Sequence, residues 1–140
     1  MAAAVTAAAD PQNNIILFER QQRVGRKLLS TGNGRCNLTN TGAEPALYNG
    51  GRDFAAPALS EYPPEKILEF FRSLGLACTE EYGGRVYPLS DSANSVVDVL
   101  RFALQKPNIE LRAACPVTAI RAEGGGFAVT CEAGETKADK

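Results

Sequence analysis

The sequence predicts an α/β protein built around a parallel sheet. Residues 15–18 (IILF) form a short uninterrupted apolar run, which is typical of a strand buried on both faces of such a sheet. An alanine-rich helix is expected just before it, at residues 1–9, because Asp10-Pro11 would end a helix there. Helix-like and strand-like segments follow along the 140 residues, which is about the length of one domain.

The composition is that of a globular chain. Hydrophobic residues make up 44%, charged residues 22%, and the net charge is -1, which argues against intrinsic disorder. No apolar run is long enough to span a membrane, and the N-terminal residues lack the basic start of a signal peptide. We therefore expect a cytoplasmic protein with no membrane partner.

The middle of the chain predicts helices on either side of a hairpin. Residues 41–62 show little periodicity and are expected to form a connecting loop. A helix should begin at Pro64 and end at Gly75, and a hairpin over residues 78–88 should follow. The apolar residues at helical spacing in the first helix, which we assign to the core, are Ile67, Leu68, Phe71 and Leu74.

The last third predicts a helix, a strand and a β-meander. Residues 90–92 (SDS) offer N-cap side chains for a helix that Pro107 would end, and residues 109–113 are a strand candidate. The triple glycine at residues 124–126 is expected to turn a hairpin in the meander. Its expected strands are 117–122, 127–132 and a third that runs toward Lys140. We expect one partial domain over 1–140, with segments 1–40, 41–108 and 109–140.

The chain has no histidine and four cysteines without a CxxC pair. These are Cys36, Cys78, Cys115 and Cys131. The absence of histidine excludes Ser-His-Asp and Cys-His catalysis, and the wide cysteine spacing argues against a zinc site, so we expect free thiols. Any redox chemistry would then come from a cofactor.

Positive charge is concentrated in residues 20–43, which contain five cations and no acid. The cations are Arg20, Arg23, Arg26, Lys27 and Arg35. Glycines, hydroxyls and amides in the same window suit close contact with anionic oxygens, although a solvated polar loop would have a similar composition. RNA binding is an alternative, but no aromatic side chain for base stacking lies between Arg20 and Asn40. We therefore favour a phosphate-bearing small molecule.

An acid ends the predicted first strand. A helix, a tight turn, a buried strand and Glu19 at its end are typical of the second half of a dinucleotide-binding βαβ unit, where the acid binds a ribose hydroxyl. The glycine fingerprint of such a unit lies roughly 20 residues before the acid. Because that position precedes Met1, we expect the first strand and the glycine loop to be missing.

Two stretches resemble the signatures of one enzyme family. Residues 25–40 (GRKLLSTGNGRCNLTN) resemble the GRKLLxSGxGRCNxTN signature of the YhiN/BaiN-like family of NAD(P)/FAD-dependent oxidoreductases, also called aminoacetone-oxidase-family flavoproteins. Thr31 stands where the signature has serine and keeps the hydroxyl. Residues 84–88 (GRVYP), followed by a Ser-Asp pair at residues 90–91, are similar to the family's second characteristic stretch.

The resemblance implies a fold and an activity. The fold is a partial glutathione-reductase-type FAD/NAD(P)-binding domain, Rossmann-like with three layers and a β-meander, without the first strand and glycine loop. The activity is that of a fragment of an FAD-dependent oxidoreductase, in which hydride passes from NAD(P)H through flavin to an organic substrate or to oxygen. Family members are longer than this chain, so both ends are expected to be truncated.

The resemblance also implies a set of FAD-binding residues and no metal ligand, and it leaves the catalytic residues unassigned. Glu19 would bind the adenosine ribose, and Val117 would place its backbone against the adenine edge. Arg26 and Lys27 would lie near the ribose and pyrophosphate. The residues expected beside the ribityl chain and the flavin ring are Gly32, Gly34, Arg35, Cys36 and Asn37.

Two alternatives to the flavoenzyme hypothesis stay open. One is a non-enzymatic module that binds nucleotide or RNA phosphates through residues 20–43. The other is a gene fragment that is inactive alone, because an incomplete sheet would bury too little surface. The hypothesis we prefer needs a small-molecule substrate and no nucleic acid partner.

Overall fold

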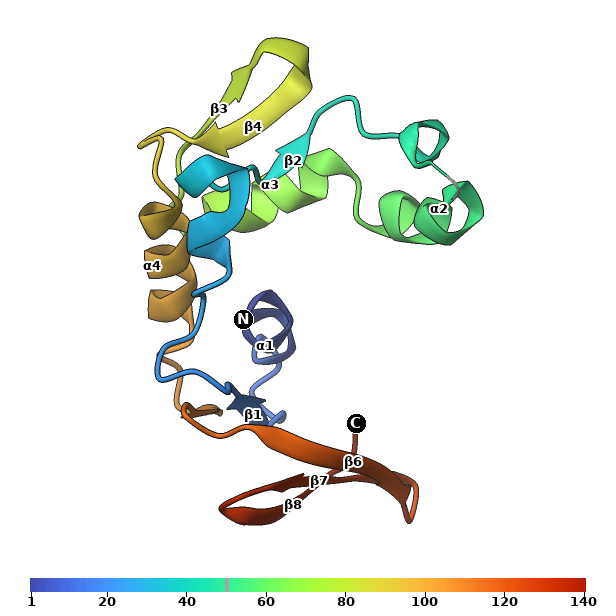
Figure 1. Cartoon of the computed structure of the whole chain (residues 1–140), viewed down its shortest axis with the longest axis vertical. Coiled ribbons are helices and arrows are strands. Elements are labelled where there is room, and N and C mark those ends of the chain that lie inside the picture. Colours follow the sequence, from blue (N-terminus) through green and yellow to red (C-terminus); the bar gives the residue numbers. More distant parts are fainter. Residues whose placement is uncertain (50) are drawn as a thin grey trace. The chain divides into compact units, whose positions relative to one another are not determined.

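The computed structural model describes residues 1–49 and 51–140, and it divides them into two compact units. The first unit joins Met1–Arg26 to Arg101–Lys140, and the second is Lys27–Leu100. Both combine helices with short strands, so the predicted α/β class is confirmed (Figure 1). The expected division into segments at residues 40 and 108 stays a prediction.

A parallel pair of strands forms the base of the first unit. Helix α1 (Ala2–Ala7) packs against β1 (Ile15–Phe18), which pairs in parallel with β5 (Ile109–Arg112). The predicted helix, strand and parallel pairing are therefore confirmed. The expected burial of both strand faces is wrong, because β1 has one partner strand and all four of its residues are only half-buried.

One side chain joins the N-terminal turn to the start of this pair. The side-chain amide of Asn108 donates to the carbonyls of Ala8 at 3.3 Å and Asn13 at 3.0 Å. The backbone carbonyl of Asn108 accepts from the Ile15 N–H at 2.8 Å. Asn108 therefore links α1, β1 and β5 where both strands begin.

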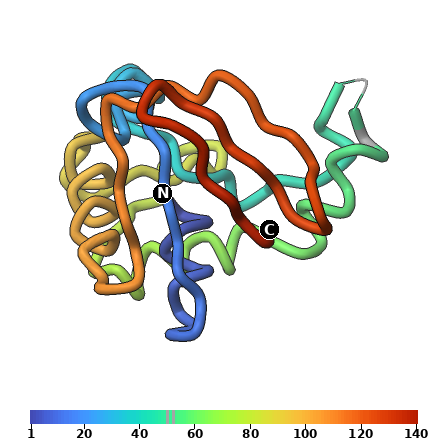
Figure 2. The backbone as a smooth tube through the Cα atoms, turned by 90° about the horizontal axis from the view of Figure 1, so that it is seen from below, coloured from blue at the N-terminus to red at the C-terminus, as the bar shows by residue number. Residues whose placement is uncertain are grey.

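A three-stranded antiparallel meander completes the first unit, as predicted. It consists of β6 (Val117–Glu123), β7 (Gly126–Cys131) and β8 (Gly134–Ala138), which Figure 2 shows running beside one another in orange and red. The first turn uses Gly124 and Gly125, both with positive φ. The best-buried side chains of the meander, Ala128 and Cys131, lie on β7.

The second unit is built on the sheet order β2-β4-β3. Strand β2 (Thr39–Asn40) pairs with β4 (Arg85–Pro88), and β4 forms the predicted hairpin with β3 (Cys78–Glu81). The predicted helix is α3 (Pro64–Ser73), which contacts β2 and ends just before Gly75. Its four apolar residues assigned to the core are only half-buried.

The expectation of a loop at residues 41–62 is wrong. A short 3₁₀ helix at Pro45–Leu47 and helix α2 (Arg52–Glu61) occupy this stretch, of which Gly50 lies outside the described residues. Pro57 lies inside α2, where a proline removes a backbone donor and normally breaks a helix. Phe54 is 92% exposed, so the helix has no apolar face that periodicity could detect.

Helix α4 (Ala93–Ala103) follows its predicted N-cap. The Asn94 N–H lies 3.3 Å from the Ser92 hydroxyl, which satisfies a donor in the first turn. One face of the helix is apolar and packed, with Val96 fully buried and Leu100 at 4% exposure. No helix within the described residues is long and apolar enough to cross a bilayer.

Candidate functional site

The signature loop has an irregular backbone. Residues Leu28–Gly34 form two short 3₁₀ turns (η1) that meet at a kink. Gly32, Asn33 and Gly34 follow one another with φ of +54°, +56° and +83°, and Cys36 has φ +62°. Because this conformation is costly for most L residues, the two glycines are the residue types that the loop requires.

Gly32 is also restricted by space. A Cβ at this position would lie 2.6 Å from the backbone nitrogen of Asn37 and 3.4 Å from the Tyr87 ring. The chain therefore folds back on itself between Gly32 and Asn37. A side chain larger than hydrogen at residue 32 would push the backbone segments around Gly32 and Asn37 apart.

Hydrogen bonds within the loop hold this shape. The Thr31 hydroxyl donates to the Leu28 carbonyl at 2.7 Å, so the threonine that replaces the signature serine makes a bond that serine could also make. The Cys36 N–H donates to the Thr31 carbonyl at 3.0 Å. Cys36 itself is 3% exposed, which makes its side chain part of the loop's packing.

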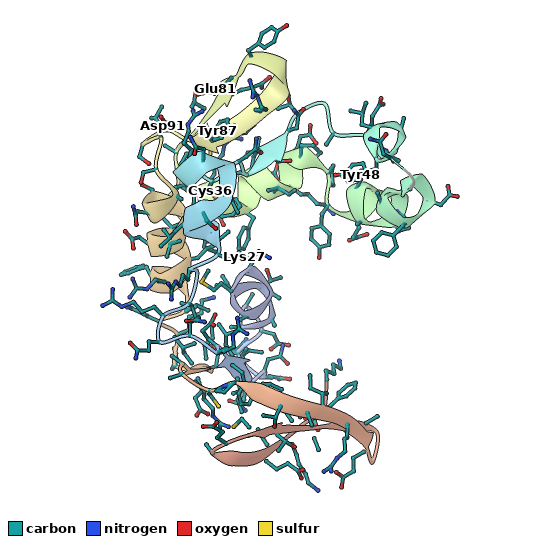
Figure 3. The ribbon with its side chains drawn as sticks, viewed as in Figure 1. Lys27, Cys36, Tyr48, Glu81, Tyr87 and Asp91 are labelled. Atoms are coloured by element: carbon teal, nitrogen blue, oxygen red, sulfur yellow. The ribbon has the colours of Figure 1, made fainter. Side chains whose placement is uncertain are left out.

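Arg35 anchors the loop to distant parts of the second unit. Its guanidinium forms ion pairs with Glu81 and Asp91 and lies over the Tyr87 ring, with 3.9 Å from Cζ to the ring centroid. A further Nη1 contact to Glu81 measures 3.3 Å. In Figure 3 the labelled Glu81, Tyr87 and Asp91 lie close together. Hydrogen bonds to Glu81 and then Asp91 raise the pKa of Arg35, which stays charged.

The sequence analysis missed both carboxylates of this cluster. Glu81 and Asp91 lie 46 and 56 residues from Arg35 along the chain, so no local spacing links them. A weak signal was available, because Tyr87 belongs to the second family stretch and Asp91 follows it directly. The positive charge of Arg35, which we expected near a cofactor, forms ion pairs with these two acids.

In the first unit, Glu19 lies where a ligand-binding acid is expected. It follows β1 at the carboxyl end of the parallel pair, and its N–H continues the ladder to the Arg112 carbonyl at 2.9 Å. Ligands of open α/β sheets bind outside the carboxyl ends of strands. One carboxylate oxygen, Oε1, accepts from the Gln21 N–H at 2.7 Å, which orients the side chain.

Two further predicted residues belong to this unit. Val117 begins β6 and is 39% exposed, and its neighbour Cys115 donates its N–H to the Glu19 carbonyl at 2.9 Å. Backbone bonds thus bring the segment before Val117 to the end of β1. Arg26 is exposed and donates to the Gln21 side chain at 3.3 Å.

The predicted residues therefore form two groups. Glu19, Arg26 and Val117 belong to the first unit, and the remaining six belong to the second. The remaining six are Lys27, Gly32, Gly34, Arg35, Cys36 and Asn37. Lys27 and Asn37 are exposed, and the Lys27 carbonyl accepts from the Ser30 hydroxyl at 2.9 Å.

All four cysteines are free thiols. Within the described part of the chain, no three acidic or thiol side chains converge to form a metal site.

Comparison with known proteins gives the family. A model described as "HI0933-like protein Rossmann domain" matches residues 1–140, the whole chain. The chain belongs to the HI0933-like family. This confirms the resemblance drawn from the two sequence stretches and the Rossmann-like fold class.

Curated relatives of the HI0933-like chain carry two kinds of name. A 3-dehydro-bile acid delta(4,6)-reductase of Clostridium scindens is 35% identical over 141 residues, covering 100% of this chain and 34% of that protein. A ribosomal RNA dihydrouridine synthase of Escherichia coli is 29% identical over 121 residues, covering 86% of this chain and 30% of that protein. The chain thus spans about a third of the length of these relatives.

A solved structure supports the fold of this HI0933-like chain. Glycine oxidase from Geobacillus kaustophilus superposes with a TM-score of 0.52 over 99% of this chain and 50% of that one. At 15% sequence identity this similarity concerns the fold alone.

Proposed function

We propose that this chain is the FAD-binding part of an oxidoreductase. The observation that carries the proposal is Glu19 at the carboxyl end of β1, with one carboxylate oxygen oriented by Gln21 and the second left for a ribose hydroxyl. The family's Rossmann domain supports it. When bound, FAD would supply hydride transfer, taking hydride from NAD(P)H and passing it to an organic substrate or to oxygen.

The residues present fit such a group. In the first unit Glu19 would accept a hydrogen bond from the ribose, Val117 would offer its backbone to the adenine edge, and Arg26 would offset phosphate charge. In the second unit Gly34, where a Cβ would meet only the Leu29 carbonyl at 3.9 Å, would permit close approach of a ring or phosphate, and Gly32 would serve by allowing the fold-back of the loop. Lys27 adds an exposed cation for the pyrophosphate.

Arg35 and Cys36 support this function by shaping the loop. Arg35 holds the loop to β3 through Glu81 and to the turn before α4 through Asp91, and Cys36 fills the interior of the loop. Asn37 would then present its amide beside the flavin as a hydrogen-bond donor. These roles bind and orient the cofactor and move no proton.

The names of the relatives favour a reduction as the overall reaction. A delta(4,6)-reductase and a dihydrouridine synthase both take their names from reductions. We propose a small organic molecule as the substrate, because the basic segment 20–43 has no aromatic side chain on which bases could stack. Ribosomal RNA is the second candidate, which the 29% identical relative favours.

The test is the Glu19→Ala variant of the full-length protein. We expect the wild type to copurify with FAD and the variant to retain it roughly 10- to 100-fold more weakly, because a charged hydrogen bond to the ribose is lost. Equilibrium dialysis followed by flavin fluorescence measures the affinity. Glu123→Ala, which removes an exposed carboxylate of the same unit, is the matched control. Equal retention in both variants would refute the role of Glu19.

The reductant and the substrate class need separate experiments. Anaerobic addition of NADH or NADPH should bleach the flavin absorbance, and the faster reaction identifies the donor. The reduced protein is then offered an unsaturated 3-oxo steroid or unmodified ribosomal RNA, and flavin reoxidation is recorded. If a protein without bound flavin binds RNA with an affinity that falls steeply with salt, the non-enzymatic alternative replaces this proposal.

A further inference from the structure

Two cysteines lie together in the first unit, and the proposed function uses neither. Cys131 ends β7 and lies opposite Val117 of β6. Cys115 is two residues before Val117, so it is a diagonal neighbour of Cys131 on the same face of the antiparallel pair. Hydrogen bonding between the two thiols is the leading cause of the pKa shift of each.

Cys131 has the surroundings of a stabilised thiolate. Its side chain is buried, and hydrogen bonding with the Cys115 thiol and with the backbone N–H groups of Ala133 and Gly134 favours its ionised form. The Cys115 bond, followed by these two and the charge of Arg112, lowers the pKa of Cys131. The same thiol–thiol bond raises the pKa of Cys115, which stays the proton donor of the pair.

Arg112 is held beside this pair. Its Nη1 donates to the Thr136 hydroxyl at 2.6 Å, and Thr136 lies on the β8 strand that pairs with β7 next to Cys131. Its Nε donates to Glu110 at 2.7 Å, so the guanidinium is held by two bonds. The charges that act on the Cys115 thiol are those of Arg112 and Glu132. A thiol with a nearby cation and backbone donors is the reactive kind of cysteine.

The other two cysteines belong to the second unit. Cys36 is 3% exposed within the signature loop. Cys78 donates to the Leu76 carbonyl at 3.7 Å, and burial raises its pKa. Both are free thiols, so they are internal controls.

We propose that Cys115 and Cys131 form a peroxide-reactive dithiol site that closes to an intramolecular disulfide. The Cys131 thiolate attacks one oxygen of hydrogen peroxide, the O–O bond breaks, and a sulfenic acid and hydroxide form. The Cys115 sulfur then attacks the Cys131 sulfur, the S–O bond breaks, and the hydroxyl leaves as water with the Cys115 proton. The two thiols lose two electrons and two protons, and peroxide becomes two waters.

The site adjoins the end of β1, since the Cys115 N–H donates to the Glu19 carbonyl at 2.9 Å. The dithiol chemistry itself requires no flavin. A failure of FAD binding would therefore leave this proposal intact, and a failure of disulfide formation would leave the proposed function intact.

The test uses the purified full-length protein, reduced, freed of reductant and exposed to hydrogen peroxide. Remaining thiols are alkylated, and the protein is digested and analysed by mass spectrometry without reduction. We expect a peptide pair joined through Cys115 and Cys131, two hydrogens lighter than the free peptides and separated by reductant. Cys36 and Cys78 should be recovered alkylated. Full alkylation of Cys115 and Cys131 after peroxide treatment would overturn the proposal.

Single variants assign the two roles. Cys115→Ser should leave a Cys131 sulfenic acid that a dimedone probe captures, because the resolving thiol is gone. Cys131→Ser should slow oxidation of Cys115 by at least roughly ten-fold, because its thiol lacks the lowered pKa. Cys78→Ser is the matched control and should form the cross-link at the wild-type rate. Oxidation of Cys115 at the wild-type rate in Cys131→Ser would contradict the assignment.

Discussion

The two units hold their predicted cofactor residues by different means. Glu19 of the first unit follows a regular strand, and its side chain is oriented by a residue two positions away. The loop around Gly32 in the second unit has consecutive left-handed residues, and it is tied down by acids 46 and 56 residues away from Arg35. A strand end positions a group by its own geometry, whereas an irregular loop depends on distant contacts.

Two arginines repeat this difference. Arg112 of the first unit takes its ion-pair partner, Glu110, from two residues before it on the same strand, and it also donates to Thr136 of β8 at 2.6 Å. Arg35 of the second unit pairs with Glu81 and Asp91 from other elements. Removing Arg112 should therefore disturb its own unit locally, whereas removing Arg35 should release a whole loop.

The largest effect is expected for Gly32→Ala, which tests the irregular loop directly. The left-handed φ and the 2.6 Å approach to the Asn37 nitrogen add together. We expect a loss of about 2–4 kcal/mol of unfolding free energy, together with loss of FAD retention. Urea denaturation followed by circular dichroism measures the first, and flavin fluorescence measures the second.

Gly124→Ala is the matched control in the regular unit. Gly124 has a similar φ of +59°, but a Cβ there would meet no atom within 4 Å. Its cost should be about 1 kcal/mol, from the backbone conformation alone, with FAD retention unchanged. Equal losses in both variants would show that the fold-back at Gly32 adds nothing, and the contrast between the units would fail.

A smaller effect is expected when the Arg35 cluster is opened. Arg35→Ala should weaken FAD retention by roughly a few-fold, because the loop loses its anchor while its own hydrogen bonds remain. Arg35→Lys should behave almost like alanine, since an ammonium cannot reproduce the guanidinium contacts to both acids. Arg112→Ala is the comparison in the first unit. Wild-type retention in Arg35→Ala, measured by dialysis, would leave the loop independent of its distant partners.

The smallest effect concerns acid stability in the first unit. The hydrogen bond from Arg112 lowers the pKa of Glu110, so the folded state favours the ionised carboxylate. The pair's contribution is therefore present above the ordinary pKa of 4.5 and is lost as the pH falls below it. Glu110→Gln should make the free energy of unfolding depend less steeply on pH in that acid range.

A series of urea titrations across the acid range measures this slope. Glu69→Gln, which removes an exposed carboxylate from α3, controls for the loss of one surface charge. If the free energy of unfolding depends on pH equally steeply in Glu110→Gln and Glu69→Gln, the Arg112–Glu110 ion pair contributes no measurable stability.

Much of the fold could be predicted because many elements carry local signals. The apolar run of β1, the glycine turn of the meander, Pro64 at the start of α3 and the cap at Ser92 each act over a few residues. Helix α2 could not be predicted, because Pro57 and the exposed Phe54 contradict both helix propensity and periodicity.

The candidate site likewise has a part that the sequence predicts and a part that it does not. The sequence by itself determined the glycine-rich basic loop, the acid after the first strand and the family, because these depend on the order of residue types. Only the tertiary structure decided that Arg35 faces Glu81 and Asp91 and that Cys115 meets Cys131. The turns between these residues have local signals, but the strand register and the side-chain directions that bring the groups together do not.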